Sequence, residues 1–196
     1  FEIRHTTSKL SEAEAGIRVV QVVMYPEYDP ETATGDLALL RLERPIIAEK
    51  YPTVATASLE QRLAPSGVQA TTLGWGITDD FNETTPDALQ ELQLRIFPEA
   101  VCDKYAYATD DGARLNYDHE HMLCAGFLTE DKGTCNGDSG GPLFVLDDTG
   151  RALLVGITSW GEECGGSNNY LEGFARVSRY HDWVFQVIAD ELRYHP

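Results

Sequence analysis

The stretch from Cys135 to Pro142, Cys-Asn-Gly-Asp-Ser-Gly-Gly-Pro, places a single serine among three glycines. Such a loop has few side chains, so it exposes the Ser139 hydroxyl and lets backbone N–H groups converge on one point. Serine is a weak nucleophile and needs a base to take its proton and donors to hold a developing oxyanion. We expect the N–H groups of Gly137 and Ser139 to form that oxyanion hole. The competing interpretation is an ordinary glycine-rich turn before a strand.

Short apolar segments separated by turn residues surround this loop. The runs Pro142–Leu146 and Leu153–Ile157 flank the turn Asp147–Gly150, which predicts a β-hairpin. Further strand-like runs occur at residues 18–24, 36–42 and 93–97. Many short strands with regular turn signals indicate an all-β sandwich or barrel.

The C-terminal segment has a different period. Apolar residues recur at helical spacing between Tyr180 and Tyr194. We expect a terminal helix with Ser178 as its N-cap, docked on the β-structure through this apolar stripe.

Composition excludes several classes of function. The chain has 196 residues, 42% of them hydrophobic, which suffices for one sizeable core or two small ones. Its formal net charge of −17 repels phosphate backbones, so we expect no nucleic-acid partner. No apolar run approaches the roughly 20 residues of a membrane span, so we expect no membrane insertion. None of the four cysteines forms a CxxC pair, so we predict two disulfides, with three pairings open, and no zinc site.

The loop from Cys135 to Pro142 resembles the nucleophile loop of the chymotrypsin- and trypsin-like serine proteases. Other segments resemble parts of the same family in the expected order, at residues 36–42, 72–76, 122–126, 159–161 and 176–180. The resemblance runs from about Ile3 to about Val187. It implies an all-β fold of two antiparallel barrels, the first incomplete, with a C-terminal helix. Residues 1–60 would be the remainder of the first barrel, and residues 61–196 the second barrel and the helix.

The resemblance also assigns catalytic roles. Ser139 would be the nucleophile, and Asp36 the acid that orients the catalytic histidine and stabilises its charged form. The family's Thr-Ala-Ala-His-Cys-type segment is absent, and four of the five histidines follow Asp36, in the wrong order. His5 precedes Asp36 but matches a strand past the catalytic position. We therefore expect the histidine to lie outside this chain, and the chain alone to be inactive.

A second family element concerns the acid before the nucleophile. In the family, a new amino terminus folds in and pairs with the residue that corresponds to Asp138, and Phe1 cannot be that terminus. Without this pairing we expect Asp138 to be an uncompensated acid near the oxyanion hole.

The same resemblance to the family implies a set of substrate-binding residues. They are Gly133 at the base of the specificity pocket, Glu172 or Gly173 on its opposite wall, Asn136 beside the nucleophile, and Ser159, Trp160 and Gly161 on the strand that pairs with substrate. Gly133 replaces the aspartate of trypsin-like members. Two orientations of Glu172 stay open: into the pocket, where it would recruit basic residues, or outward, which leaves an apolar pocket. Glu162 and Glu163 add negative potential near the mouth.

The resemblance pairs Cys102 with Cys124 and Cys135 with Cys164, and implies a secreted protein. Asn82-Glu83-Thr84 is a glycosylation sequon. His119 and His121 form an H-x-H pair, which we interpret as a solvated loop, and we predict no calcium site at Glu12 and Glu14. We expect no metal and no cofactor.

The function predicted is therefore that of a serine-type endopeptidase that acts on polypeptides. We expect protein protease inhibitors as further partners, and a monomer if the chain is complete. The alternative is a catalytically inactive homologue that binds proteins through the same cleft.

Overall fold

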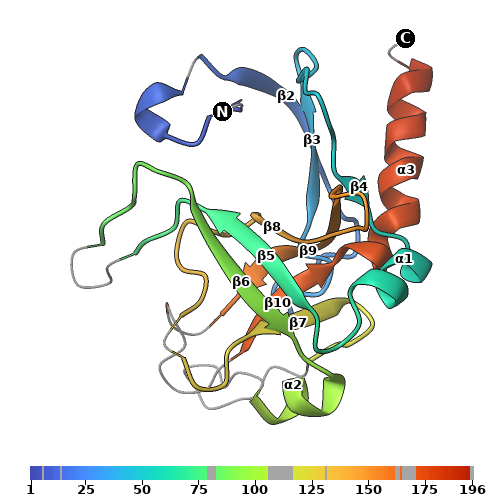
Figure 1. Cartoon of the computed structure of the whole chain (residues 1–196). Helices are drawn as coiled ribbons and strands as arrows, with labels where there is room; N and C mark the ends of the chain where they lie inside the picture. The colour runs from blue at the N-terminus through green and yellow to red at the C-terminus, as the bar shows by residue number, and fades with distance from the viewer. Residues whose placement is uncertain are drawn as a thin grey trace.

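Ten strands in the described part of the chain form two sheets of unequal size (Figure 1). The computed structural model describes residues 1–5, 7–13, 15–78, 83–105, 117–130, 132–161, 164 and 171–194. The small sheet contains β1 (Glu2–Ile3), β2 (Ile17–Met24) and β3 (Ala38–Leu42). The large sheet contains β4 (Thr53–Val54), β5 (Gln69–Gly74), β6 (Gln90–Ile96), β7 (Met122–Gly126), β8 (Pro142–Leu146), β9 (Ala152–Trp160) and β10 (Leu171–Arg176).

The large sheet closes into a six-stranded antiparallel barrel. Its strands follow the order β10-β7-β6-β5-β8-β9, and β10 also pairs with β9. Strand β4 adds to β9 in parallel, as an extra strand outside the barrel. The predicted all-β class and the β8–β9 hairpin are confirmed. The small sheet is open, with the order β1-β2-β3.

Two apolar clusters share the strand β7, because its alternate side chains point to opposite faces. Leu123 and Ala125 join the main cluster inside the barrel, whose centre contains the fully buried Leu94 and Phe174. Cys124 joins a second cluster outside the barrel, beneath α2 (Glu99–Tyr105). β7 is therefore buried on both faces, which explains its continuous apolar sequence.

Two short helices were not predicted. They are α1 (Ala57–Leu63) and α2, seven residues each. The 3-10 turn at Leu10–Glu12 was not predicted either. Thr56 caps α1 by accepting a hydrogen bond from the Leu59 N–H at 3.3 Å. Two helical turns are too short to show a clear apolar period in the sequence.

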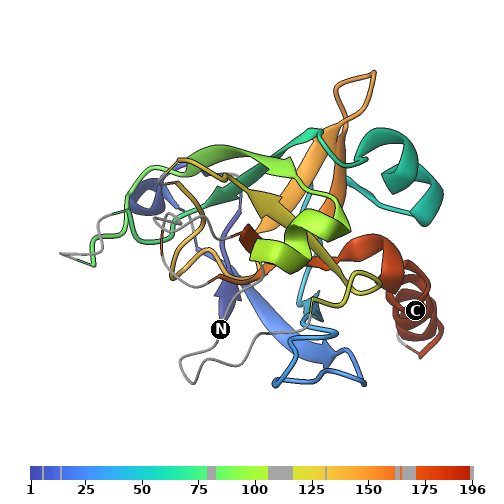
Figure 2. The same cartoon turned by 90° about the horizontal axis from the view of Figure 1, so that it is seen from below.

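The C-terminal helix α3 (Val177–Tyr194) is present, but the prediction of Ser178 as its N-cap is wrong. Strand β10 continues directly into α3, so Ser178 lies inside the first turn and its hydroxyl donates to Glu60 at 2.5 Å. Figure 2 shows α3 leading away from the barrel, with α2 on the barrel wall.

The apolar stripe of α3 docks only in its first half. Tyr180 and Val184 are buried, whereas Ile188 and Leu192 are 42% and 68% exposed. Tyr25, which follows β2, packs edge-on against Tyr180 at 4.9 Å between ring centroids. This contact attaches the small sheet to the first half of α3.

Candidate active site

The loop that carries Ser139 consists of two successive β-turns. In both Cys135–Asp138 and Asp138–Gly141, the last N–H donates to the first carbonyl, at 2.9 and 2.8 Å. The third residue of each turn is a glycine with positive φ, +101° at Gly137 and +79° at Gly140. Glycine adopts that conformation without strain, as a type II turn requires. Ser139 consequently occupies the second position of its turn and is exposed.

Alternate N–H groups of this loop remain available. The Asp138 N–H closes the first turn and the Gly140 N–H donates to the Thr158 carbonyl at 2.9 Å. In the part of the chain that the structure describes, the N–H groups of Gly137 and Ser139 donate to no other residue. Two unused donors beside a serine hydroxyl are the arrangement that an oxyanion requires.

Asp138 turns its carboxylate away from this site, into a cradle of glycines. It accepts hydrogen bonds from the Gly76 N–H at 2.8 Å and the Cys135 N–H at 2.9 Å. A Cβ on Gly74 or Gly76 would overlap the carboxylate oxygens, at 1.8 and 2.3 Å. Among the described residues no basic side chain pairs with Asp138. Backbone donors therefore compensate the acid, which the sequence had left without a partner.

Asp36 reaches the barrel from the small sheet. It precedes β3, and its Oδ2 accepts a hydrogen bond from the Ser159 hydroxyl at 2.6 Å. The preceding residue, Gly35, donates its N–H to the Tyr180 hydroxyl at 2.9 Å, which fixes the backbone at this point. A Cβ on Gly35 would lie 2.6 Å from the Tyr25 ring, so glycine is required for this close approach.

Ser159 and Ser139 lie on one cavity of about 280 Å³. Its walls are Thr134, Cys135, Asn136, Ser139, Thr158, Ser159, Trp160, Gly161 and Cys164. The structure thus brings together five predicted site residues, Ser139, Asn136, Ser159, Trp160 and Gly161. Asp36 adjoins them through Ser159.

Three predicted substrate-binding residues are not on the described wall of this cavity. Gly133 lies on a separate cavity of about 70 Å³, beside Asp138. Gly173 lies under Trp160, whose indole would be only 2.0 Å from a Cβ at that position. Gly173 therefore allows Trp160 to pack against β10.

Glu172 is 7% exposed and lies behind the cavity wall. One carboxylate oxygen accepts the N–H of Thr134, a residue on the cavity, and Oε2 has no hydrogen-bond partner in the described structure. Burial raises the pKa of Glu172 to about 7; the Thr134 hydrogen bond opposes this increase, and the charge of Asp138 adds to it. Sequence reasoning missed Thr134, because only the fold shows that its N–H contacts this buried acid.

No histidine among the described residues lines the Ser139 cavity. The two members of the H-x-H pair contact different carboxylates: His119 lies 2.8 Å from Asp103, and His121 lies 2.5 Å from Asp118. The described residues contain no cluster of three or more possible metal ligands. The sequon residue Asn82 lies outside the described residues, as do Glu14, Glu162, Glu163 and His195.

Both predicted disulfides are present. Cys102 of α2 bonds to Cys124 of β7, and Cys135 bonds to Cys164. The second disulfide fixes the first residue of the nucleophile loop against the segment after β9. No described helix is long and apolar enough to cross a membrane.

On this closed antiparallel barrel, an exposed serine lies beside two free donors, its own N–H and that of Gly137, an arrangement that suits a serine hydrolase. Comparison with known proteins makes this more specific, because the Trypsin family model matches residues 2–184. The chain belongs to the trypsin family and is a trypsin-like serine protease domain.

Similar proteins come from several organisms. The chain is 33% identical to Transmembrane protease serine 9 of Rattus norvegicus over 92% of this chain and 16% of that protein. It is 33% identical to Trypsin eta of Drosophila melanogaster over 86% of this chain and 59% of that protein. It is 32% identical to Vitamin K-dependent protein C of Oryctolagus cuniculus over 91% of this chain and 38% of that protein. The chain therefore spans less than two thirds of the length of these relatives.

Proposed function

We propose that this domain is the larger part of a serine endopeptidase in which Ser139 attacks the peptide carbonyl. The observation that carries the proposal is the hydrogen bond from Ser159 to Asp36 on the cavity that also contains Ser139. This hydrogen bond supports an acid role for Asp36, because it brings the carboxylate of the segment before β3 next to the cavity of the exposed nucleophile. A histidine between these two groups would have its acid partner in position.

The chemistry proceeds by acyl transfer. A histidine base takes the proton of the Ser139 hydroxyl as its oxygen bonds to the substrate carbonyl carbon, and the carbonyl oxygen becomes an oxyanion. The N–H groups of Gly137 and Ser139 hold this oxyanion. The histidine then returns its proton to the leaving amine, the C–N bond breaks, and water later releases the acyl group by the same steps. The base is a histidine outside these 196 residues.

The substrate is a polypeptide whose backbone pairs with residues 159–161 at the end of β9. We infer that Glu172 shapes the pocket through its hydrogen bond to Thr134, as a positioning residue, without touching the substrate. Asn136 is assigned to substrate binding because it also lines the Ser139 cavity, whereas Gly133 is assigned on the family resemblance alone. The two disulfides support secretion, because such bonds persist in oxidising compartments. Protein protease inhibitors are further partners of the same cleft, and we infer that the complete protein is a monomer that needs no cofactor.

The test is peptide hydrolysis by the full-length native protein. Ser139→Ala removes the nucleophile, and Asp36→Asn preserves the shape of the acid while removing its charge. We expect Ser139→Ala to abolish turnover and Asp36→Asn to lower kcat by about 10⁴-fold, as loss of the acid does in a serine protease triad. Full turnover by a folded, sequence-verified Ser139→Ala protein would overturn the proposal.

The second candidate is a protease homologue that binds proteins without cleaving them. It is favoured by the positions of the described histidines, none of which lies on the Ser139 cavity. Stable peptide binding by the full-length protein, without turnover and unaffected by Ser139→Ala, would select this function.

A further inference from the structure

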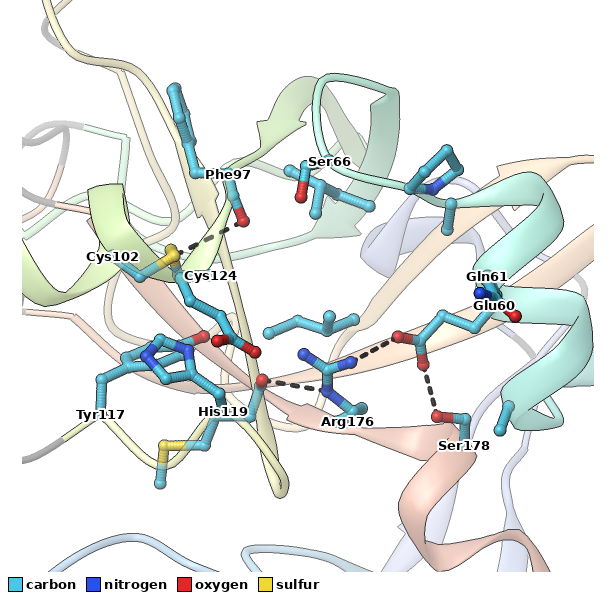
Figure 3. Close-up of a pocket in the computed structure, with 17 residues that line it drawn as sticks. Glu60, Gln61, Ser66, Phe97, Cys102, Tyr117, His119, Cys124, Arg176 and Ser178 are labelled. Carbon is cyan, nitrogen blue, oxygen red and sulfur yellow. Dashed lines mark hydrogen bonds and ion pairs between the residues drawn. A yellow bond between two sulfur atoms is a disulfide. The ribbon is translucent and has the colours of Figure 1, made fainter.

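A second, larger cavity lies between α1, α2 and the start of α3 (Figure 3). Its volume is about 490 Å³, and it shares no lining residue with the Ser139 cavity. Its apolar wall comes from Ile96, Phe97, Met122 and Leu123. Its polar groups are Glu60, Gln61, Ser66, Glu99, Tyr117, His119, Arg176 and Ser178.

One side of the cavity is closed by a charge pair that is already satisfied. Glu60 is 6% exposed and accepts from Arg176 Nη1 at 2.8 Å and from the Ser178 hydroxyl. Arg176 also donates through Nε to the Met122 carbonyl at 3.1 Å. Glu60 and Arg176 therefore cancel each other's charge and contribute little net potential to the cavity.

Tyr117 also lines the cavity, and its hydroxyl takes no part in the hydrogen bonds of Glu60 and Arg176. Its side chain is 8% exposed, and its hydroxyl has no hydrogen-bond partner in the described structure. In Figure 3 this hydroxyl points toward the middle of the cavity, on the side where Arg176 lies. A buried hydroxyl without a partner costs free energy, and a ligand that hydrogen-bonds to it would recover that cost.

The charge of the cavity decides which ligand fits. The charges of Glu60 and Arg176 cancel, and His119 pairs with Asp103. Among the described residues, Glu99 is therefore the acid lining the cavity that has no ion-pair partner. The whole chain carries a net charge of −17, which also attracts cations. An anion would therefore be repelled, whereas a cation would meet Glu99.

We propose that this cavity binds an alkylammonium group, such as a lysine side chain, with the ammonium donating to the Tyr117 hydroxyl oxygen and the Glu99 carboxylate. Its methylene stem packs against Phe97 and the other apolar wall residues. An ammonium group has three donors, which suits two acceptors on one side of a cavity. The site is independent of the Ser139 chemistry.

The test is calorimetric titration of the full-length protein with N-acetyl-lysine methylamide, and with the norleucine derivative as its uncharged counterpart. The variant Tyr117→Phe removes only the hydroxyl, and Glu99→Gln removes only the negative charge. The control is Glu49→Gln, at an exposed glutamate that lines neither cavity. We expect binding of the lysine derivative alone, weakened about fivefold or more by Tyr117→Phe and by Glu99→Gln and unchanged by Glu49→Gln. Thermal melts identify a variant that has lost its fold.

Equal binding of the lysine and norleucine derivatives, no measurable binding of either, or unchanged affinity in folded Tyr117→Phe would overturn the proposal. Titration with a Gly-Lys-Gly peptide and with n-pentylamine distinguishes the source of the ammonium group. Tighter binding of the peptide supports a protein partner, and tighter binding of pentylamine supports a free amine as the natural ligand. The Ser139→Ala protein should bind as the parent does, so failure of this site and failure of the protease proposal are distinguishable.

Discussion

The buried acid Glu172 makes the stability of this domain depend on pH in an unusual direction. Burial raises the pKa of Glu172 to about 7 in the folded chain, against an ordinary value of 4.5. A carboxyl whose pKa is raised on folding holds its proton more tightly in the folded than in the unfolded chain. Its contribution to stability is therefore greatest below pH 4.5 and is lost as the pH rises toward 7. At 1.36 kcal/mol per pKa unit, the loss amounts to about 3 kcal/mol at about pH 8 and about 1 kcal/mol at about pH 5.

Glu172→Gln removes the ionisation and keeps an oxygen that can accept from Thr134. The assay is urea unfolding of parent and variant at about pH 5 and about pH 8. We expect the variant to gain about 2 kcal/mol relative to the parent between these two pH values. The exposed Glu49→Gln control should show no such gain. A difference between parent and Glu172→Gln that is the same at both pH values would refute the reasoning, because it would mean that Glu172 does not titrate on a raised pKa.

Two other predictions concern packing. Arg176→Met leaves the buried Glu60 carboxylate without its ion-pair partner and should lower the free energy of unfolding by about 3 kcal/mol. The control Arg193→Met removes an exposed ion pair with Asp190 and should change the free energy of unfolding by less than about 0.5 kcal/mol. Urea unfolding at neutral pH measures both. Val22 and Met24 are 47% and 59% exposed on one face of the open sheet, so the 196-residue chain should associate as its concentration rises, and polar substitutions at both positions should reduce this in light scattering. A parent chain that stays monomeric at every concentration would contradict the second prediction.

Local patterns in the sequence predicted the parts of the fold that depend on neighbouring residues. The β8–β9 hairpin followed from two apolar runs around a turn, and the exposure of Ser139 followed from the glycines of its loop, which adopt positive φ in the structure. The N-cap at Ser178 failed for a tertiary reason, since its hydroxyl bonds to Glu60 on α1, 118 residues away in the sequence.

In the candidate site, too, local sequence predicted some residues, whereas others depended on contacts between distant parts of the chain. Ser139 was evident from its own loop, but Asp36 depended on resemblance, because its partner Ser159 lies 123 residues further along the chain. The orientation of Glu172 could not be predicted, since it depends on a hydrogen bond from Thr134, 38 residues away in the sequence. No sequence pattern indicated the cavity around Tyr117, because its walls come from α1, β6, α2, β7, β10 and α3, which meet only in the folded chain.

The central claim is that Ser139 is an activated nucleophile, and covalent labelling tests it most directly. Full-length native protein is treated with a fluorophosphonate, which reacts with serine hydroxyls that a neighbouring base has activated, and the modified residue is located by peptide mass spectrometry. The account predicts one adduct on Ser139, absent from Ser139→Ala and strongly slowed in Asp36→Asn. A folded native protein that forms no adduct at Ser139, or forms its adduct at another serine, would contradict it.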